Sequence, residues 1–136
     1  MSAKDTADKI NQDLRNRLGA KINILAKSLL MGTPVGDPTF WSFPPPANYV
    51  GGHAKKNWQK SLGSPATNEI DGVDPGGTQT LATMMVTDSD LGQVIYFSNN
   101  VKYIRRLEYG YSKRQAPNGW VRLAVQRVGI GEANIK

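Results

Sequence analysis

The longest regular pattern in the chain is a row of apolar side chains spaced by four residues, and once by three. Such spacing places the side chains on one side of a helix, so the row predicts an amphipathic helix over residues 3–31. Ser2 with Asp5 is typical of a capping box at its start, and Gly32 is typical of its end. At about 1.5 Å per residue this helix is roughly 40 Å long, so we expect it to lie across a sheet and extend toward a neighbouring subunit. The row, which we expect in the core, comprises Ile10, Leu14, Leu18, Ile22, Leu25 and Leu29.

Two later segments carry strand patterns. Trp58, Lys60 and Leu62 recur with period two within residues 54–62, which indicates a strand. Residues 93–98, QVIYFS, form the continuous apolar run of a buried strand. We expect these segments to pair in a small, mainly antiparallel sheet.

The segment between the two strands admits two interpretations. Asp74 followed by Pro75 can begin a short helix over residues 75–86, while the Thr and Val content of residues 80–87 favours a strand nearly as well. The helix would place three apolar side chains on one face: Leu81, Met84 and Met85.

Two short helices complete the expected fold. Residues 101–110 predict a helix that Gly110 ends, and Asn118 can cap a last helix that starts at Gly119. At 136 residues the chain is long enough for one core and too short for two domains. The sequence therefore predicts one α+β domain over residues 1–136, with a long N-terminal helix, a small mainly antiparallel sheet and short C-terminal helices.

Residues 33–52 form no regular element in this prediction, because five prolines and three glycines interrupt them. The segment nevertheless holds four aromatic side chains, more than a free linker requires. We interpret it as an ordered arm that packs on the domain or on an adjacent subunit; the alternative is a self-packed surface loop. The aromatic side chains predicted at a subunit or partner interface are Phe40, Trp41, Phe43, Tyr49 and, after the arm, Trp58.

Charge separates the last quarter of the chain from the rest. Residues 1–100 hold nine basic and nine acidic side chains, whereas residues 101–136 hold eight basic side chains and only Glu108 and Glu132 as acids. The whole net charge of +6 therefore lies in the last 36 residues. This asymmetry indicates an anionic partner or a solvated basic surface. The basic residues expected to face a channel or a partner are Arg105, Arg106, Lys113 and Arg114.

The residues that most enzymes and metal sites require are scarce. There is no cysteine, and His53 is the only histidine, so zinc sites and thiol chemistry have no basis here. No phosphate-binding glycine loop or nucleophile elbow is present. No apolar run has the length of a signal peptide core or a membrane span. We expect a soluble intracellular protein that is not an enzyme and has no cofactor, metal or membrane partner.

Three blocks of sequence resemble a known family. They are TPVGDPTFW (33–41), YVGGHAKKNWQ (49–59) and NNVKYIRRLEYGYSKRQAPNGWVRLAV (99–125). Taken in order, they resemble the neck, or tail-completion, proteins of tailed bacteriophages. The last block is the most specific of the three. Lys102 and Trp120 stand where that family usually has proline and methionine.

The resemblance implies a structural virion protein of the head-to-tail connector, assembled in the cytoplasm of the bacterial host. Such a protein forms a hexameric or dodecameric ring that joins head-closure proteins to tail proteins and leaves a channel for genomic DNA. A tail-terminator ring is the alternative within this class, and a small basic protein that binds nucleic acid without sequence preference is the alternative outside it.

The last block also has a physical interpretation of its own. Tyr103 and Leu107, four residues apart, are expected to seat their helix on the sheet. Glu108 is expected to pair with an arginine, such as Arg105 or Arg106, or to accept backbone N–H bonds. Gly110 is expected to end the helix with a positive φ. The motif residues expected to serve packing and interfaces are Tyr103, Leu107, Glu108, Gly110, Pro117 and Gly119.

Overall fold

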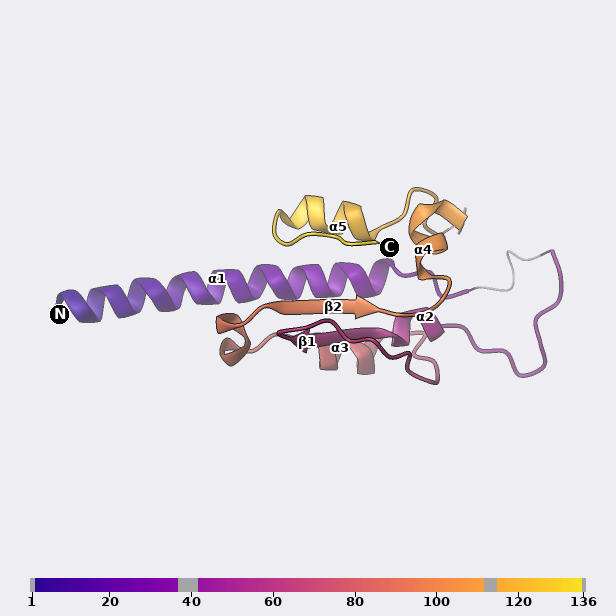
Figure 1. Ribbon diagram of the computed structural model, residues 1–136, viewed down its shortest axis with the longest axis horizontal. Coiled ribbons are helices and arrows are strands. Elements are labelled where there is room, and N and C mark those ends of the chain that lie inside the picture. Colours follow the sequence, from indigo (N-terminus) through magenta and orange to yellow (C-terminus); the bar gives the residue numbers. More distant parts are fainter. Residues whose placement is uncertain (1, 37–41, 112–114, 136) are drawn as a thin grey trace.

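Helices and two short strands follow one another in the computed structural model, which describes residues 2–36, 42–111 and 115–135. The strands pair into one two-stranded antiparallel sheet. The expected α+β fold, with its long N-terminal helix and short C-terminal helices, is confirmed (Figure 1). The elements are α1 (Ala3–Gly32), α2 (His53–Lys56), β1 (Trp58–Leu62), α3 (Thr78–Met84), η2 (Asp88–Gly92), β2 (Ile95–Asn99), α4 (Ile104–Arg106), η3 (Leu107–Tyr111) and α5 (Val121–Val128).

Helix α1 begins and ends where the sequence predicts. The Ser2 hydroxyl accepts a hydrogen bond from the Asp5 backbone N–H at 3.1 Å, and the Asp5 carboxylate accepts one from the Ser2 N–H at 3.1 Å. These two bonds form the predicted capping box. At the other end the backbone becomes extended at Thr33, whose N–H donates to the Leu30 carbonyl at 3.2 Å.

Only the C-terminal half of α1 lies in the core. Leu25 and Leu29 are buried, whereas Ile10, Leu14 and Leu18 are 54%, 56% and 42% exposed. The prediction that the whole row packs in the core is therefore wrong. The reason is length: α1 is about 45 Å long and a five-residue strand about 17 Å, so the sheet covers only part of the helix. The N-terminal half projects beyond the other elements (Figure 1).

The sheet joins the two predicted strands in a register that runs from Trp58 opposite Asn99 to Leu62 opposite Ile95. Residues 54–56, expected in the first strand, instead belong to the helical turn α2, where the Asn57 side-chain amide donates to the His53 carbonyl at 2.9 Å. β2 was expected to be fully buried, but it is half-buried. A sheet of two strands leaves part of each strand open to solvent.

Of the two interpretations of the segment between the strands, the helix is correct: it forms α3. The Asp74 carboxylate accepts hydrogen bonds from the Thr80 N–H and hydroxyl, both at 2.8 Å, which anchors the first turn. The helix begins at Thr78, three residues after the predicted start. Met84 is fully buried, and Leu81 packs beside it, as expected for one helical face.

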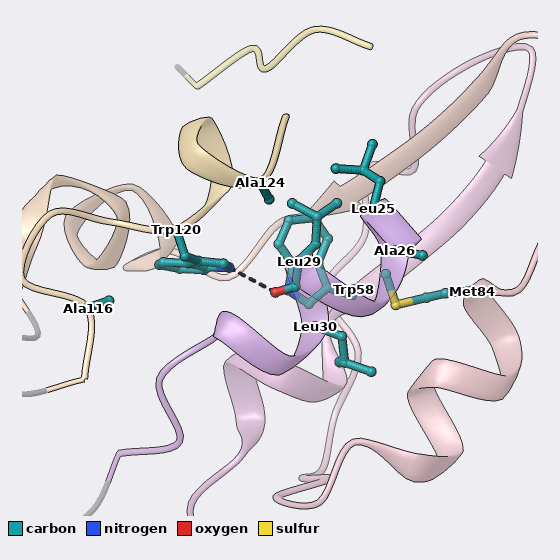
Figure 2. Packing of buried hydrophobic residues seen from close by; sticks show 9 residues of the cluster. All are labelled: Leu25, Ala26, Leu29, Leu30, Trp58, Met84, Ala116, Trp120 and Ala124. Carbon is teal, nitrogen blue, oxygen red and sulfur yellow. Dashed lines mark hydrogen bonds between the residues drawn. The ribbon is translucent and has the colours of Figure 1, made fainter. Parts of the chain in front are cut away.

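The core gathers around the last two turns of α1 (Figure 2). α3 and β1 approach α1 from the sheet side, and α5 packs along its other side. Trp58 lies in this core, so the prediction that it faces a subunit interface is wrong. Its side chain is buried by the chain itself. The buried cluster consists of Leu25, Ala26, Leu29, Leu30, Trp58, Met84, Ala116, Trp120 and Ala124.

Two indole N–H groups secure the end of α1. Trp120 Nε1 donates to the Leu29 carbonyl at 2.8 Å, and the Thr33 hydroxyl donates to the same carbonyl at 2.7 Å (Figure 2 shows the tryptophan bond). Trp58 Nε1 donates in turn to the Thr33 hydroxyl at 2.8 Å. Gly32 leaves room for this arrangement, because a Cβ there would lie 2.7 Å from Trp120 Cδ1. Trp120 and Thr33 thereby satisfy a carbonyl that the helix cannot pair internally, and Trp58 holds the Thr33 hydroxyl in place.

We expect Trp120→Ala to lower the free energy of unfolding by about 3–5 kcal/mol, since it removes a large buried ring and leaves a cavity. Trp120→Phe keeps most of the ring but loses the bond to Leu29, and should cost about 1 kcal/mol. Chemical denaturation monitored by circular dichroism measures both. Gln126→Ala, an exposed change on α5, is the control; equal stability of all three variants would contradict the role of Trp120.

Candidate functional site

Residues 99–128, the basic segment, fold around one buried carboxylate. α4 and η3 form two successive turns in place of the single predicted helix, and Gly110, with φ +93°, breaks the helical path as expected. Ile104 and Leu107 pack against the core, but Tyr103 is exposed, so its predicted seating on the sheet is wrong. The next residue, Ile104, packs against the core instead.

Glu108 is only 1% exposed and caps the start of α5. Its Oε1 accepts hydrogen bonds from the N–H groups of Trp120 at 2.7 Å and Val121 at 2.8 Å. Its Oε2 accepts from the Arg122 N–H at 3.1 Å and from Arg122 Nε at 2.7 Å. Both predicted partner types, an arginine and backbone N–H groups, are therefore present. Asn118 was expected to cap this helix, but the cap comes from Glu108, a carboxylate distant in sequence.

Opposing effects set the charge of Glu108. Burial alone would raise the pKa of this carboxyl group, but the Arg122 guanidinium and three backbone N–H donors outweigh it, so the pKa is lower than its ordinary value. A carboxylate is also the favoured group at a helix N-terminus, where the backbone carries partial positive charge. Glu108 is consequently ionised at neutral pH.

Glycines permit the carboxylate to reach α5. Gly119 has φ +77°, and a Cβ there would collide with the Glu108 carbonyl oxygen and lie 2.5 Å from Oε1. A Cβ at Gly110 would lie 2.6 Å from the Pro117 carbonyl oxygen. Gly110 and Gly119 are thus close-packed positions, whereas Pro117 is exposed and contributes only its backbone carbonyl to this contact.

The turn before α5 attaches this segment to the chain beyond α1. The Gln115 side-chain oxygen accepts a hydrogen bond from the Val35 N–H at 2.8 Å, and Ala116 is buried beside Trp120. The most distinctive sequence block is therefore a packing unit that joins the C-terminal segment to the end of α1.

The surface of the basic segment carries an aromatic ring beside two arginines. Tyr109 is 49% exposed, and the Cζ atoms of Arg122 and Arg105 lie over its ring at 4.5 Å and 5.7 Å from the centroid. Arg105 and Arg106 are both exposed, and their predicted orientation toward a channel or partner stays a prediction. Lys113 and Arg114, predicted to face the same way, lie outside the described residues.

Residues 42–52 of the arm lie at the end of the domain away from the N-terminus (Figure 1). Phe43 is exposed in the single chain, and Tyr49 is half-buried, with its hydroxyl donating to the Gly36 carbonyl at 2.8 Å. Phe40 and Trp41, the other two predicted interface residues of the arm, lie outside the described residues.

His53 joins α2 to the acidic loop that follows β1. Its Nδ1 lies 2.7 Å from the Gly72 carbonyl and its Nε2 lies 2.9 Å from a Glu69 carboxylate oxygen. These contacts, led by the bond to Gly72, raise the pKa of the imidazole above its ordinary value. Both ring nitrogens of His53 therefore attach the loop, at Gly72 and Glu69, to α2. Within the described ranges, no three His, Cys, Asp or Glu side chains are arranged to hold a metal ion.

No protein-family model, curated protein or solved structure matches the chain. Among the described residues, no helix has the length and apolar content needed to cross a membrane.

Two residues of this segment were not among the predicted site residues. One is Arg122, which supplies the guanidinium that pairs with Glu108, fourteen residues earlier in the chain. Tyr109 follows Arg105 by four residues, a spacing that brings side chains together on a helix and was available as a signal. The pairing with Arg122 had no such local signal, because it depends on the turn between η3 and α5.

Replacing the capping carboxylate tests its role. We expect Glu108→Gln to lower the free energy of unfolding by about 1–3 kcal/mol at neutral pH, because an amide oxygen cannot satisfy all the buried donors. The pKa of Glu108 is depressed in the folded chain, so its contribution is complete above the ordinary value of 4.5 and is lost as the pH falls through the folded-state pKa. The stability difference between the two proteins should therefore shrink in acid.

Denaturant unfolding at a series of pH values provides the measurement. Glu132→Gln removes the other acid of the last quarter, which is exposed, and serves as the matched control. A Glu108→Gln protein as stable as this control at neutral pH would show that the cap contributes nothing.

Proposed function

We propose that the protein is a structural virion component of a bacteriophage neck, in which identical subunits form a ring between the head-closure layer and the tail. The observation that carries the proposal is the projecting half of α1, which keeps an exposed apolar row outside the body of the subunit. The resemblance of the last sequence block to neck proteins supports the same class. A tail-terminator ring is the alternative that uses the same surfaces.

The projecting half of α1 has the pattern of a helix made for contact. Ala3, Ala7, Ile10, Leu14 and Leu18 follow one another at spacings of four, three, four and four, so they share one side. All five are exposed in the single chain. Apolar side chains exposed in a continuous row are typical of interaction surfaces. We name these five residues the α1 row.

A ring supplies a partner for this row. In a closed ring each subunit uses one surface to contact a different surface of the next subunit, so a projection on one side and a receiving surface on another are required. The arm around Phe43 projects from the opposite end of the subunit and provides a second exposed segment for such contacts. Head-closure and tail proteins would meet the remaining faces of the ring.

The charge distribution agrees with a channel that DNA crosses. All of the net charge of +6 lies in the last quarter of the chain, and a moderate positive potential attracts DNA without sequence preference. One observation also favours the second candidate, a monomeric nucleic-acid-binding protein: Tyr109 is half exposed and lies beside two arginines.

We expect Ile10→Gln to weaken self-association by about tenfold or more, because a buried isoleucine contributes about 1.5–3 kcal/mol to a contact. The fold should change in stability by less than about 0.5 kcal/mol, since Ile10 is exposed in the single chain. Light scattering over a range of protein concentrations measures the assembled mass, and attachment to DNA-filled, tailless heads measures docking.

Lys9→Gln is the matched control, because it introduces the same side chain on the same turn, about 100° around the helix from Ile10 and outside the α1 row. It should assemble and attach like the unaltered protein. A chain that remains monomeric at every concentration and does not attach to heads would overturn the neck proposal. Equal assembly of both variants would show that the α1 row is not a contact surface of the ring.

A further inference from the structure

Tyr109 holds two guanidinium groups together on the surface of the basic segment. Arg122 Cζ lies 4.5 Å and Arg105 Cζ lies 5.7 Å from the centre of its ring, so the two Cζ atoms are at most about 10 Å apart. The ring remains 49% exposed. Arginines that stack on an aromatic ring lose fewer conformations when they bind a ligand than free ones do, because their planar groups are already oriented.

The buried carboxylate fixes one of these guanidinium groups. Arg122 Nε donates to Glu108 Oε2 at 2.7 Å, and its Nη2 donates to the Glu108 carbonyl at 3.3 Å. A guanidinium has five N–H donors, so these two bonds leave others for a ligand. The Arg122 side chain is half exposed, whereas that of Glu108 is buried beneath it. The carboxylate therefore orients Arg122 while remaining hidden from a ligand.

The surroundings are rich in cations and poor in exposed acids. Arg105, Arg106 and Lys102 are all exposed on the same short segment. Glu108 offsets the charge of Arg122, so the other cations of this surface add to its positive charge. Glu132 is the only other acid of residues 101–136, and it lies beyond α5.

We propose that Arg105, Tyr109 and Arg122 form a binding site for the phosphodiester backbone of double-stranded DNA. Arg105 and Arg122 donate hydrogen bonds to phosphate oxygens, and Tyr109 keeps their guanidinium groups near each other. With DNA as its ligand, this site rests on the proposed function, for which it identifies the residues that meet the passing duplex.

The geometry favours DNA over an acidic protein surface. Duplex DNA carries one negative charge per about 1.7 Å of its axis, so a 10 Å length holds about six phosphates, and the two arginines meet those on the near side. Isolated carboxylates on a protein rarely reach that density. The guanidinium groups already lie over the Tyr109 ring, so the ring orients them and does not stack on bases. The site should consequently ignore base sequence.

The test is a titration of the protein with a short fluorescent DNA duplex of mixed sequence, by anisotropy at two salt concentrations. The protein concentration is kept where light scattering gives the mass of a monomer. Arg105→Gln should weaken binding about three- to tenfold and lower the slope of log affinity against log salt by about one. Tyr109→Ala should also weaken binding, whereas Tyr109→Phe should bind like the unaltered protein.

Arg17→Gln, an exposed arginine on the projecting half of α1, is the charge-matched control and should have little effect. Thermal unfolding checks that each variant is folded, and Arg105→Gln alters only an exposed side chain. Equal losses for Arg105→Gln and Arg17→Gln would overturn the site. Equal losses for Tyr109→Phe and Tyr109→Ala would also overturn it, because they would assign binding to the hydroxyl. Polyglutamate that competes as well as unlabelled DNA would show that the surface takes acidic proteins instead.

The outcome is separable from that of the proposed function. A monomer that binds DNA through Arg105 but never assembles or attaches to heads supports the site and overturns the neck ring. A protein that assembles and attaches to heads but binds no DNA at low salt overturns the site and leaves the ring intact.

Discussion

Two indole N–H groups converge on the last turn of α1, and the arrangement of the whole domain depends on that meeting. Trp120 reaches the Leu29 carbonyl directly, and Trp58 reaches it through the Thr33 hydroxyl. Trp58 begins the first strand and Trp120 precedes the last helix, so one helix end positions both the sheet and the C-terminal segment. A buried polar contact of this kind determines orientation, which apolar packing alone leaves less defined.

Glu108 extends this constraint to the surface. Its carboxylate holds the backbone at Trp120 and the start of α5, and the same carboxylate orients Arg122 beside the exposed ring of Tyr109. One side chain therefore connects the core contact of Trp120 to the surface proposed to meet DNA. The ion pair of Glu108 is with Arg122 and not with the exposed Lys102 or Arg105.

Local pattern predicted those parts of the fold that depend on neighbours in sequence. The capping box of Ser2 and Asp5, the end of α1 at Gly32 and the positive φ of Gly110 all follow from residues within a few positions. The role of Glu108 was predicted by type, as a carboxylate that accepts N–H bonds and pairs with an arginine.

Predictions failed where distant segments decide. The apolar row of α1 has one continuous pattern, yet its first half is exposed, because the extent of burial is set by the length of the sheet and not by the row itself. Trp58 was assigned to an interface, although Thr33, twenty-five residues away, provides its partner inside the core. The sequence also did not predict which arginine pairs with Glu108, because only the folded turn before α5 brings Arg122 to it.

The distance in sequence between Leu29 and Trp120 also shapes the order in which the chain folds. Their hydrogen bond joins residues 91 positions apart, so this part of the core closes only after the elements between them, α2 to η3, have been synthesised. A helix such as α1 forms within about a microsecond, well before that closure. Until α5 is made, the side of α1 that it covers is open to solvent, so premature association with other chains competes with the docking of α5.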